Sequence, residues 1–261
     1  MAARTDSSAA ALIFAAGMGT RLKSEDAANK GLPKQYMRVD STPILAYTLQ
    51  IFQKINAVSA IYLVTNPNFR SRVDEIRDDY EITKLASVIP GGSTALESIF
   101  NGLDFMVRDG MPGDTVVLIH DGVRPIITQD LIKSNISGTR ENGNAITCIP
   151  AFETAALRES AGDLVSDVVD RQRAVVLQAP QTFLLDQIHG VNVRAKQDGI
   201  LDQYVDQAGL CNHYGIPLHL VDGIRGNIKI TTTDDLSYFS YLVQSGEYDR
   251  LTSERVAKEA Q

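Results

Sequence analysis

Five short segments of this sequence carry residue types that could bind or transfer a phosphate group, and the first is a glycine loop. Residues 15–21 read AAGMGTR, in which two glycines let backbone amides approach a polyphosphate closely and Arg21 adds a fixed cation. A dinucleotide-binding loop would have a third glycine where Leu22 stands, and no P-loop lysine follows. The segment therefore indicates either another kind of phosphate loop or an ordinary strand-to-helix turn.

Two lysines and a glycine pair could serve the same anion. Lys34 follows a proline in a predicted loop, where it is either solvated or placed beside a phosphate. Lys229 lies in the strand-like run NIKIT at 227–231, so its side chain must either reach solvent or meet an anion. Gly91 and Gly92 join a predicted strand to a capped helix, where free amides suit an anion or a carbonyl oxygen. The ordinary alternative for this pair is a plain strand–helix turn.

Asp121 is the candidate metal ligand. It belongs to the segment HDGVRP at 120–125, directly after the apolar run 116–119. An aspartate at the carboxyl end of a central parallel strand is well placed to hold Mg²⁺. Arg124, three residues further on, could neutralise a phosphate or pair with Asp121. His120 is expected to be structural, so the segment predicts a single carboxylate facing a phosphate site.

Apolar runs alternate with segments of helical period along the chain. Helices are predicted after Pro43, after Thr94 and over 236–243, and Thr94 forms a capping-box pattern with Glu97. Because the apolar runs are continuous, they read as parallel strands covered on both faces. The predicted strands are 11–15, 60–65, 86–89, 116–120, 145–149, 175–178 and 218–221. The alternation predicts an α/β fold, a mostly parallel sheet with helices on both faces and ligands beyond the carboxyl ends of its strands.

One stretch departs from this pattern. Residues 152–173 hold acids, bases and short valine pairs without helical period, and we interpret them as an arm that leaves the sheet. Residues 1–8 and 246–261 are polar or small and are expected to be flexible ends. The remainder, 9–245, shows no repeat and no linker, which predicts a single domain.

Composition excludes several classes of protein. The chain has 261 residues, 44% of them hydrophobic, and a net charge of −7, which argues against a general nucleic-acid or membrane-surface binder. No apolar run reaches the ~18 residues of a membrane span, and no basic region precedes a signal-like core. Two cysteines, Cys148 and Cys211, are too few for a disulfide framework or a cysteine zinc site. A reducing cytoplasm is therefore the expected compartment.

Seven motifs in order resemble the cytidylyltransferase family of the 2-C-methyl-D-erythritol 4-phosphate and ribitol-5-phosphate enzymes, over about residues 9–245. The motifs are Gly17-Met18-Gly19-Thr20-Arg21, Pro33-Lys34-Gln35, Gly91-Gly92, His120-Asp121 with Arg124-Pro125, Asp170-Arg171, Pro180-Gln181 and Asn227-Ile228-Lys229. The resemblance implies a Rossmann-like α/β domain whose β-arm, 152–173, locks a homodimer. It also implies a reaction that moves CMP from CTP to a polyol phosphate of the ribitol 5-phosphate type and releases pyrophosphate.

The resemblance assigns roles to particular residues, with Mg²⁺ as the implied cofactor. The implied catalytic cations are Arg21, Lys34 and Lys229, and the implied metal ligand is Asp121. The implied CTP-binding residues are Ala15, Ala16, Gly17, Gly19, Gly91, Gly92, Ser98, Asp121 and Gly122. The acceptor would contact Arg124 and, across the dimer interface, Thr154 and Arg171. An acceptor monoester is largely dianionic at pH 7, since its second pKa is about 6, so positioning and charge neutralisation suffice without a general base.

Two departures from the family pattern leave the acceptor open. Ala95 stands where the family often has arginine, and Ala179 stands where a threonine commonly precedes the Pro-Gln pair. The alternatives are the methylerythritol-phosphate enzyme of isoprenoid synthesis, a cytidylyltransferase for another phosphate or phosphonate acceptor, and a non-catalytic nucleotide-binding subunit. Retention of the charged phosphate-site residues argues against the last of these. The missing third glycine argues against a dinucleotide-dependent oxidoreductase.

Overall fold

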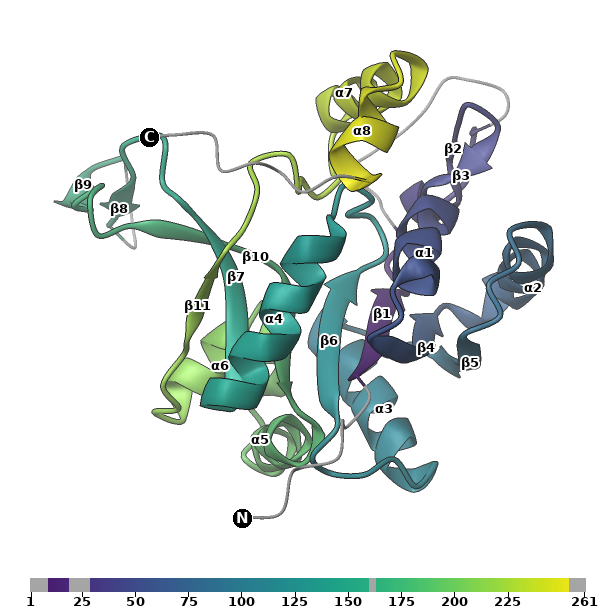
Figure 1. Cartoon of the computed structure of the whole chain (residues 1–261). Coiled ribbons are helices and arrows are strands. Elements are labelled where there is room, and N and C mark those ends of the chain that lie inside the picture. The colour runs from purple at the N-terminus through teal and green to yellow at the C-terminus, as the bar shows by residue number, and fades with distance from the viewer. Residues whose placement is uncertain (1–8, 19–28, 160–162, 254–261) are drawn as a thin grey trace.

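The computed structural model describes residues 9–18, 29–159 and 163–253, and its strands build one central sheet (Figure 1). The sheet has seven strands in the order β11-β7-β10-β6-β1-β4-β5. Their bounds are β1 Ala9–Ala15, β4 Val58–Thr65, β5 Leu85–Pro90, β6 Val116–Asp121, β7 Asn144–Pro150, β10 Val175–Leu184 and β11 Leu220–Asp222. All neighbouring pairs are parallel except those of β10, which runs antiparallel to both β6 and β7. The predicted mostly parallel α/β sheet is confirmed.

Helices cover both faces of the sheet because alternate residues of a strand point to opposite sides. Along β1, Ala11 and Ile13 belong to a core cluster with α1, α2, α4 and α7, whereas Ala10 and Leu12 belong to a second cluster with α3 and α5. The α-helices are α1 Ile44–Lys54, α2 Arg70–Asp79, α3 Ala95–Arg108, α4 Gln129–Asn142, α5 Leu185–Gln197, α6 Gln207–His213, α7 Thr233–Gln244 and α8 Glu247–Ser253. Within the described ranges, no helix combines the length and apolar character that crossing a membrane requires.

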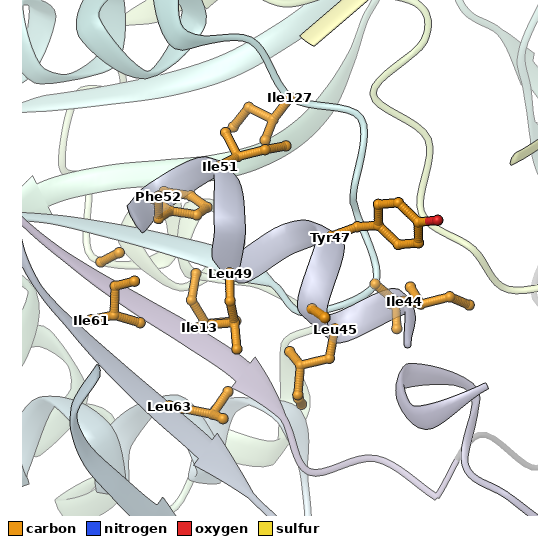
Figure 2. Packing of buried hydrophobic residues seen from close by; sticks show 14 of the residues in the cluster. Ile13, Ile44, Leu45, Tyr47, Leu49, Ile51, Phe52, Ile61, Leu63 and Ile127 are labelled. Carbon is orange, nitrogen blue, oxygen red and sulfur yellow. The ribbon is translucent and has the colours of Figure 1, made fainter. Parts of the chain in front are cut away.

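The packing of α1 shows how one helix is fixed to the sheet (Figure 2). Leu45, Leu49 and Phe52 recur at helical spacing and are fully buried. They belong to the same buried cluster as Ile13 of β1 and Ile61 of β4. Burying one such side chain contributes about 1.5–3 kcal/mol. The helix predicted after Pro43 is therefore present, and it packs against β1 and β4 on one face of the sheet.

Short elements complete the described chain. Three 3₁₀ turns lie in loops, and a small hairpin of β2 and β3 precedes α1. The bounds are η1 Lys34–Tyr36, η2 Pro67–Phe69, η3 Leu201–Gln203, β2 Arg38–Val39 and β3 Thr42–Pro43. Of these, η1 bears directly on the site described below.

Strand β10 is longer than the predicted strand at 175–178. A proline removes a backbone donor and normally interrupts a strand. In the structure the strand continues through Pro180, which follows a cis peptide bond, to Leu184. Its pairing with β7 shifts register between Leu177 and Gln181. The proline thus lies at an irregularity of the ladder, which is where a sheet accommodates it.

Residues 152–159 and 163–173 leave the sheet as a two-stranded hairpin, which lies between the end of β7 and the start of β10 in Figure 1. Its strands, β8 Ala156–Arg158 and β9 Val165–Val168, pair antiparallel, and all their residues are exposed. The protruding arm is therefore present, and it adds no core to its own domain.

The end of the chain is more ordered than the sequence predicted. Residues 246–261 were expected to be flexible, but 247–253 form α8, which packs beside α7. Tyr248 is buried, and its ring lies edge-on to Tyr47 at 5.1 Å and to Phe239 at 5.6 Å between centroids. The polar composition of the segment concealed this aromatic anchor. Its residues after 253 lie outside the described ranges.

Candidate active site

A cavity of about 400 Å³ opens at the carboxyl ends of β1 and β6. Parallel strands end at one edge of the sheet, so loops that are distant in sequence meet there. The predicted site residues that line this cavity are Ala15, Ala16, Gly17, Lys34, Gly92, Ser98, Asp121 and Lys229. Gly19 and Arg21, also predicted for the site, lie outside the described residues.

A second cavity of about 220 Å³ adjoins the first. The two share Phe14, Ala95, Asp121 and Lys229 in their walls. The remaining polar lining of the second cavity comes from other loops: Arg124, Gln178, Gln181, Asp206 and Gln207. The site therefore has two compartments, and Asp121 and Lys229 stand where they meet.

The 3₁₀ turn η1 presents Lys34 to the larger cavity. Its next residue, Gln35, is buried and donates from Nε2 to the carbonyl oxygens of Ala15 at 2.6 Å and Gly17 at 2.9 Å. Tyr36 hydrogen-bonds through its hydroxyl to the Thr65 hydroxyl at the end of β4, at 2.5 Å. The lysine therefore stands on a turn tied to two strand ends, and sequence reasoning had assigned Gln35 no role.

The amides of the glycine pair are already bonded within the chain, which corrects the prediction that they are free. Gly91 N donates to Thr65 O at 2.8 Å, and Gly92 N donates to Ser98 Oγ at 3.0 Å. Ser93 N donates to the Glu97 carboxylate at 2.6 Å, and hydrogen bonds from Ser93 lower the pKa of Glu97. The loop therefore shapes the cavity wall rather than offering these donors to an anion.

The predicted capping of α3 is half present. Thr94 accepts a hydrogen bond from Glu97 N at 3.1 Å, as a helix N-cap does. The Glu97 carboxylate accepts from the amide and the hydroxyl of Ser93, both at 2.6 Å, and the Thr94 amide makes a smaller contribution to its lowered pKa. By holding residue 93, this carboxylate fixes the loop that leads into the helix.

Two predicted CTP-binding glycines do not line the cavity. A Cβ at Gly91 would collide with Ala16 Cβ, so this glycine permits close approach of two loops. Gly122 donates from N to Phe14 O at 3.0 Å, and a Cβ there would lie 2.9 Å from Ala15 Cβ. Both residues therefore bring the strand ends together beneath the cavity wall.

Asp121 is the electrostatic centre of the site. It is 5% exposed, its Oδ2 accepts from Arg124 Nε at 2.9 Å, and its Oδ1 forms an ion pair with Lys229 Nζ. Burial opposes ionisation of this carboxyl, but the charges of Lys229 and Arg124 outweigh it and hold the pKa of Asp121 below its usual range. Asp121 is therefore ionised at neutral pH and fixes two cations at the junction of the cavities.

Lys229 lies in an irregular segment, not in the strand that the run 227–231 predicted. Ile230 is fully buried and donates from N to Val123 O at 2.9 Å, so an apolar residue anchors a loop here. Asn227, also fully buried, donates from Nδ2 to Ala179 O at 2.6 Å and accepts from Arg124 at its own carbonyl, at 2.7 Å. This asparagine ties the lysine segment to β10 and to Arg124.

His120 is buried beneath the site and lines neither cavity. Its Nε2 lies 3.1 Å from Arg124 O, and its ring centroid lies 5.3 Å from that of Phe52. Burial lowers the pKa of His120 to about 4. The imidazole is therefore neutral at pH 7, with Nε2–H as the donor to the Arg124 carbonyl.

This histidine predicts a loss of stability on mild acidification. Between pH 6.5 and about 4 the unfolded chain binds a proton at His120 that the folded chain does not, so the free energy of unfolding falls as the pH falls. His120→Gln keeps a donor for the Arg124 carbonyl but cannot titrate. From pH 7 to 4 we expect the wild type to lose about 3 kcal/mol more than this variant in urea unfolding. Parallel pH profiles would contradict the assignment.

The three predicted acceptor residues occupy two regions. Arg124 lines the smaller cavity, although Asp121 and Asn227 already engage two of its nitrogens. Thr154 and Arg171 are exposed on the arm segment and line neither cavity of their own chain. Contact of these two with an acceptor requires a second chain and stays a prediction.

Fold and site together define a class of enzyme. A Rossmann-like sheet ends at a cavity with a glycine loop, two lysines and a buried aspartate, a set suited to moving a nucleotidyl group by charge neutralisation. The chain belongs to the IspD family, whose family model, described as 2-C-methyl-D-erythritol 4-phosphate cytidylyltransferase, matches residues 9–245. The resemblance seen in the sequence motifs is thereby confirmed, and the chain is a cytidylyltransferase.

Relatives with two different acceptor names resemble the chain. Ribitol-5-phosphate cytidylyltransferase of Streptococcus agalactiae is 37% identical over 240 residues, 92% of this chain and 97% of the relative. 2-C-methyl-D-erythritol 4-phosphate cytidylyltransferase of Geobacillus kaustophilus is 31% identical over 235 residues, 90% of this chain and 96% of the relative. The crystal structure of 4-diphosphocytidyl-2C-methyl-D-erythritol synthase from Anaerococcus prevotii shares the fold, with a TM-score of 0.76, 23% identity and coverage of 92% and 97%.

Proposed function

We propose that this chain transfers CMP from CTP to the phosphate of ribitol 5-phosphate and releases pyrophosphate. The observation that carries the proposal is the two-compartment site with Asp121 and Lys229 at its junction. The acceptor is favoured by the relatives named for ribitol 5-phosphate, which are 37–38% identical over 91–92% of the chain. Relatives named for 2-C-methyl-D-erythritol 4-phosphate are 31–36% identical over 86–90% of the chain. We place the reaction in the cytoplasm, since both cysteines are free and buried and the fold uses no disulfide between them.

In the proposed reaction an oxygen of the acceptor phosphate attacks the α-phosphorus of CTP. The new P–O bond forms as the bond to the β-phosphate oxygen breaks, and the electron pair leaves with pyrophosphate. Lys34, beside Gly17, neutralises the triphosphate in the larger cavity, and Lys229 meets the transferred phosphoryl group at the junction. The acceptor phosphate is already deprotonated, so no side chain has to remove a proton.

The donor set fits a magnesium ion held chiefly by the substrate. No group of three acidic, histidine or cysteine side chains gathers among the residues described, so a cage made by protein alone is not built there. Mg²⁺ commonly takes one or two carboxylates together with substrate phosphates. Asp121 Oδ1 becomes available for it when Lys229, whose side chain is 40% exposed, turns to a phosphate. When bound, the ion supplies further charge neutralisation on the triphosphate.

Pyrophosphate release tests the acceptor. The protein is incubated with CTP, MgCl₂ and either ribitol 5-phosphate or 2-C-methyl-D-erythritol 4-phosphate, and kcat/KM is compared. We expect at least a tenfold preference for ribitol 5-phosphate, about 1.4 kcal/mol of discrimination. The opposite preference would favour the second acceptor, which the family model and the Geobacillus relative support. Silence with both, while CTP still binds, would contradict both acceptors.

We further propose that the arm joins two copies of the chain into a homodimer. Leu157, Leu164, Val165 and Val168 are each more than half exposed on a hairpin that has no core of its own. A two-stranded hairpin is marginal in water, and a cluster of exposed apolar side chains marks an interaction surface. A second copy would cover these residues and bring Thr154 and Arg171 toward the partner site.

Replacing one of these apolar residues by a charge is expected to separate the dimer. Val165→Glu would desolvate a carboxylate at the interface, so light scattering should report one chain near 28.5 kDa, half the mass of the wild-type assembly. Val107→Glu, at an exposed position on α3 away from the arm, is the control and should stay dimeric. A monomeric wild type would contradict the homodimer.

A further inference from the structure

We propose that Gln35 is a positioning residue that sets the start of the glycine loop and thereby the grip of the site on a triphosphate. This inference rests on the proposed use of CTP, and it does not depend on which acceptor is used. Gln35 lines the larger cavity, yet only 2% of its surface is exposed. Gln35 directly follows Lys34 and so lies in the site, but its side chain carries neither a charge nor a nucleophile.

The Gln35 amide donates two hydrogen bonds to the start of the glycine loop. A primary amide has two N–H donors, and Gln35 uses Nε2 for both Ala15 O at 2.6 Å and Gly17 O at 2.9 Å. Ala15 and Gly17, the residues that carry these oxygens, line the cavity that the triphosphate would occupy. Each oxygen accepts one hydrogen bond from Gln35 and therefore faces a donor. Without that donor they would present partial negative charge beside an anion.

The turn that carries Gln35 is fixed independently of the glycine loop, because Tyr36 bonds Thr65 and stacks on Phe69 at 4.9 Å between centroids. On the loop itself, Ala16 packs against Gly91 and Met18 Sδ accepts from Asn66 Nδ2 at 3.4 Å. A Cβ built at Gly17, between them, would meet no atom of the described chain within 4 Å. The two hydrogen bonds from Gln35 therefore hold the loop at Gly17 in the position set by a fixed turn.

Gln35 also sets the spacing between the turn that carries Lys34 and the glycine loop. Lys34 and Gln35 lie on the same 3₁₀ turn, so the two bonds from Gln35 also fix the distance between Lys34 and Gly17. A triphosphate that contacts both the lysine and the loop depends on that distance, because binding groups act together only when they are held in register. A nucleoside monophosphate lacks the β- and γ-phosphates and depends on it much less.

Binding titrations with CTP and with CMP, in the absence of any acceptor, test this role. The variants are Gln35→Ala, which removes the donor, and Gln35→Glu, which replaces it by a carboxylate that can regain one O–H donor on protonation. The control is Gln53→Glu on α1, the same change in a glutamine that bridges Thr83 and Lys84 and lines neither cavity. Thermal unfolding of each variant checks the fold.

We expect Gln35→Glu to bind CTP about 100-fold more weakly than the wild type at pH 8, and Gln35→Ala about tenfold more weakly. The affinity for CMP should change less than about threefold in both. The deficit of Gln35→Glu relative to the wild type should shrink at least fivefold by pH 5.5. Burial, the two facing carbonyl oxygens and the anionic Asp121 favour the protonated carboxyl, and they oppose the cationic Lys34 and Lys229, which favour its ionised form. Gln53→Glu should match the wild type.

Two results would overturn the inference. One is a CTP affinity of Gln35→Glu within threefold of the wild type at pH 8. The other is an equal loss of CTP and CMP affinity with a lowered melting temperature, which is what a purely structural role produces. Because no acceptor enters these titrations, a wild type that binds CTP but releases no pyrophosphate with ribitol 5-phosphate would contradict the proposed acceptor and leave the role of Gln35 standing.

Discussion

The Lys229→Met variant is expected to turn over about 10³-fold more slowly than the wild type at saturating substrates. Lys229 Nζ pairs with Asp121 in the wall that both cavities share, where the proposed reaction brings the acceptor to the α-phosphate. Negative charge is redistributed over the transferred group in the transition state, so a fixed cation there stabilises that state more than the bound substrates. Loss of one such preorganised group typically costs ~10²–10³ in kcat, and a full charge stands at the upper end.

The measurement is pyrophosphate release with CTP and ribitol 5-phosphate, with kcat and KM determined separately. The loss should fall mainly on kcat, because the larger cavity keeps its other CTP-lining residues. Melting temperature should change little, since the side chain is 40% exposed and Asp121 retains Arg124 at 2.9 Å. The matched control is Lys196→Met. Lys196 is an exposed residue of α5, and its ammonium lies over the Phe100 ring of α3. A kcat within tenfold of the wild type would contradict the assignment of Lys229.

The strands that end at this site could be predicted because their signal is local. A continuous apolar run such as Val116–Ile119 has few structural alternatives to a buried strand, and the polar residue that follows it must then lie at the sheet edge. That reasoning predicts Asp121 and the glycine loop at one edge of the sheet from the sequence alone. It gave the right α/β class for the same reason.

The segment around Lys229 could not be predicted in this way. Ile228 and Ile230 alternate with polar neighbours as they would in a strand. The segment is nevertheless an irregular loop, in which the Ile230 side chain is fully buried. Periodicity over five residues does not distinguish the two conformations. The bonding of the glycine-pair amides was hidden for a related reason. Their acceptors, Thr65 O at the end of β4 and Ser98 Oγ in the first turn of α3, are brought to them only by the fold.

The amide side chains that organise the site, Gln35 and Asn227, stand in the sequence motifs, but their roles were not predicted. Gln35 bonds backbone carbonyls 18 and 20 residues away, and Asn227 bonds the Ala179 carbonyl 48 residues away. A glutamine or asparagine in a polar loop is ordinarily solvated, and nothing local reveals a distant backbone partner. The partners of such amides are brought near only when the fold assembles the edge of the sheet. The lysines of the site could therefore be predicted from the sequence, whereas the roles of Gln35 and Asn227 could not.

Asp121→Asn is expected to affect both stability and catalysis, since it removes the carboxylate that pairs with both Lys229 and Arg124. Asparagine has nearly the same shape, so the change leaves Lys229 and Arg124 facing a neutral group in a site that is largely shielded from water. Breaking a fully buried pair costs about 3–5 kcal/mol. The exposed part of Lys229 is screened by solvent, so we expect about 2–3 kcal/mol in urea unfolding at pH 7, where the wild-type carboxyl is ionised because its pKa is lowered.

Asp78→Asn provides the comparison, because Asp78 pairs with Arg77 at 2.9 Å on the surface and its side chain is 68% exposed. Solvent screens that pair, so Asp78→Asn should leave urea unfolding almost unchanged. The turnover of Asp121→Asn should also fall about 10³-fold, and added MgCl₂ should not restore it, since the proposed carboxylate ligand is gone. Unchanged stability would show that Lys229 and Arg124 need no buried counter-charge. A rate recovered by magnesium would show that the ion is held by the substrate without Asp121, so the two readouts separate the structural role of this carboxylate from its role toward the metal.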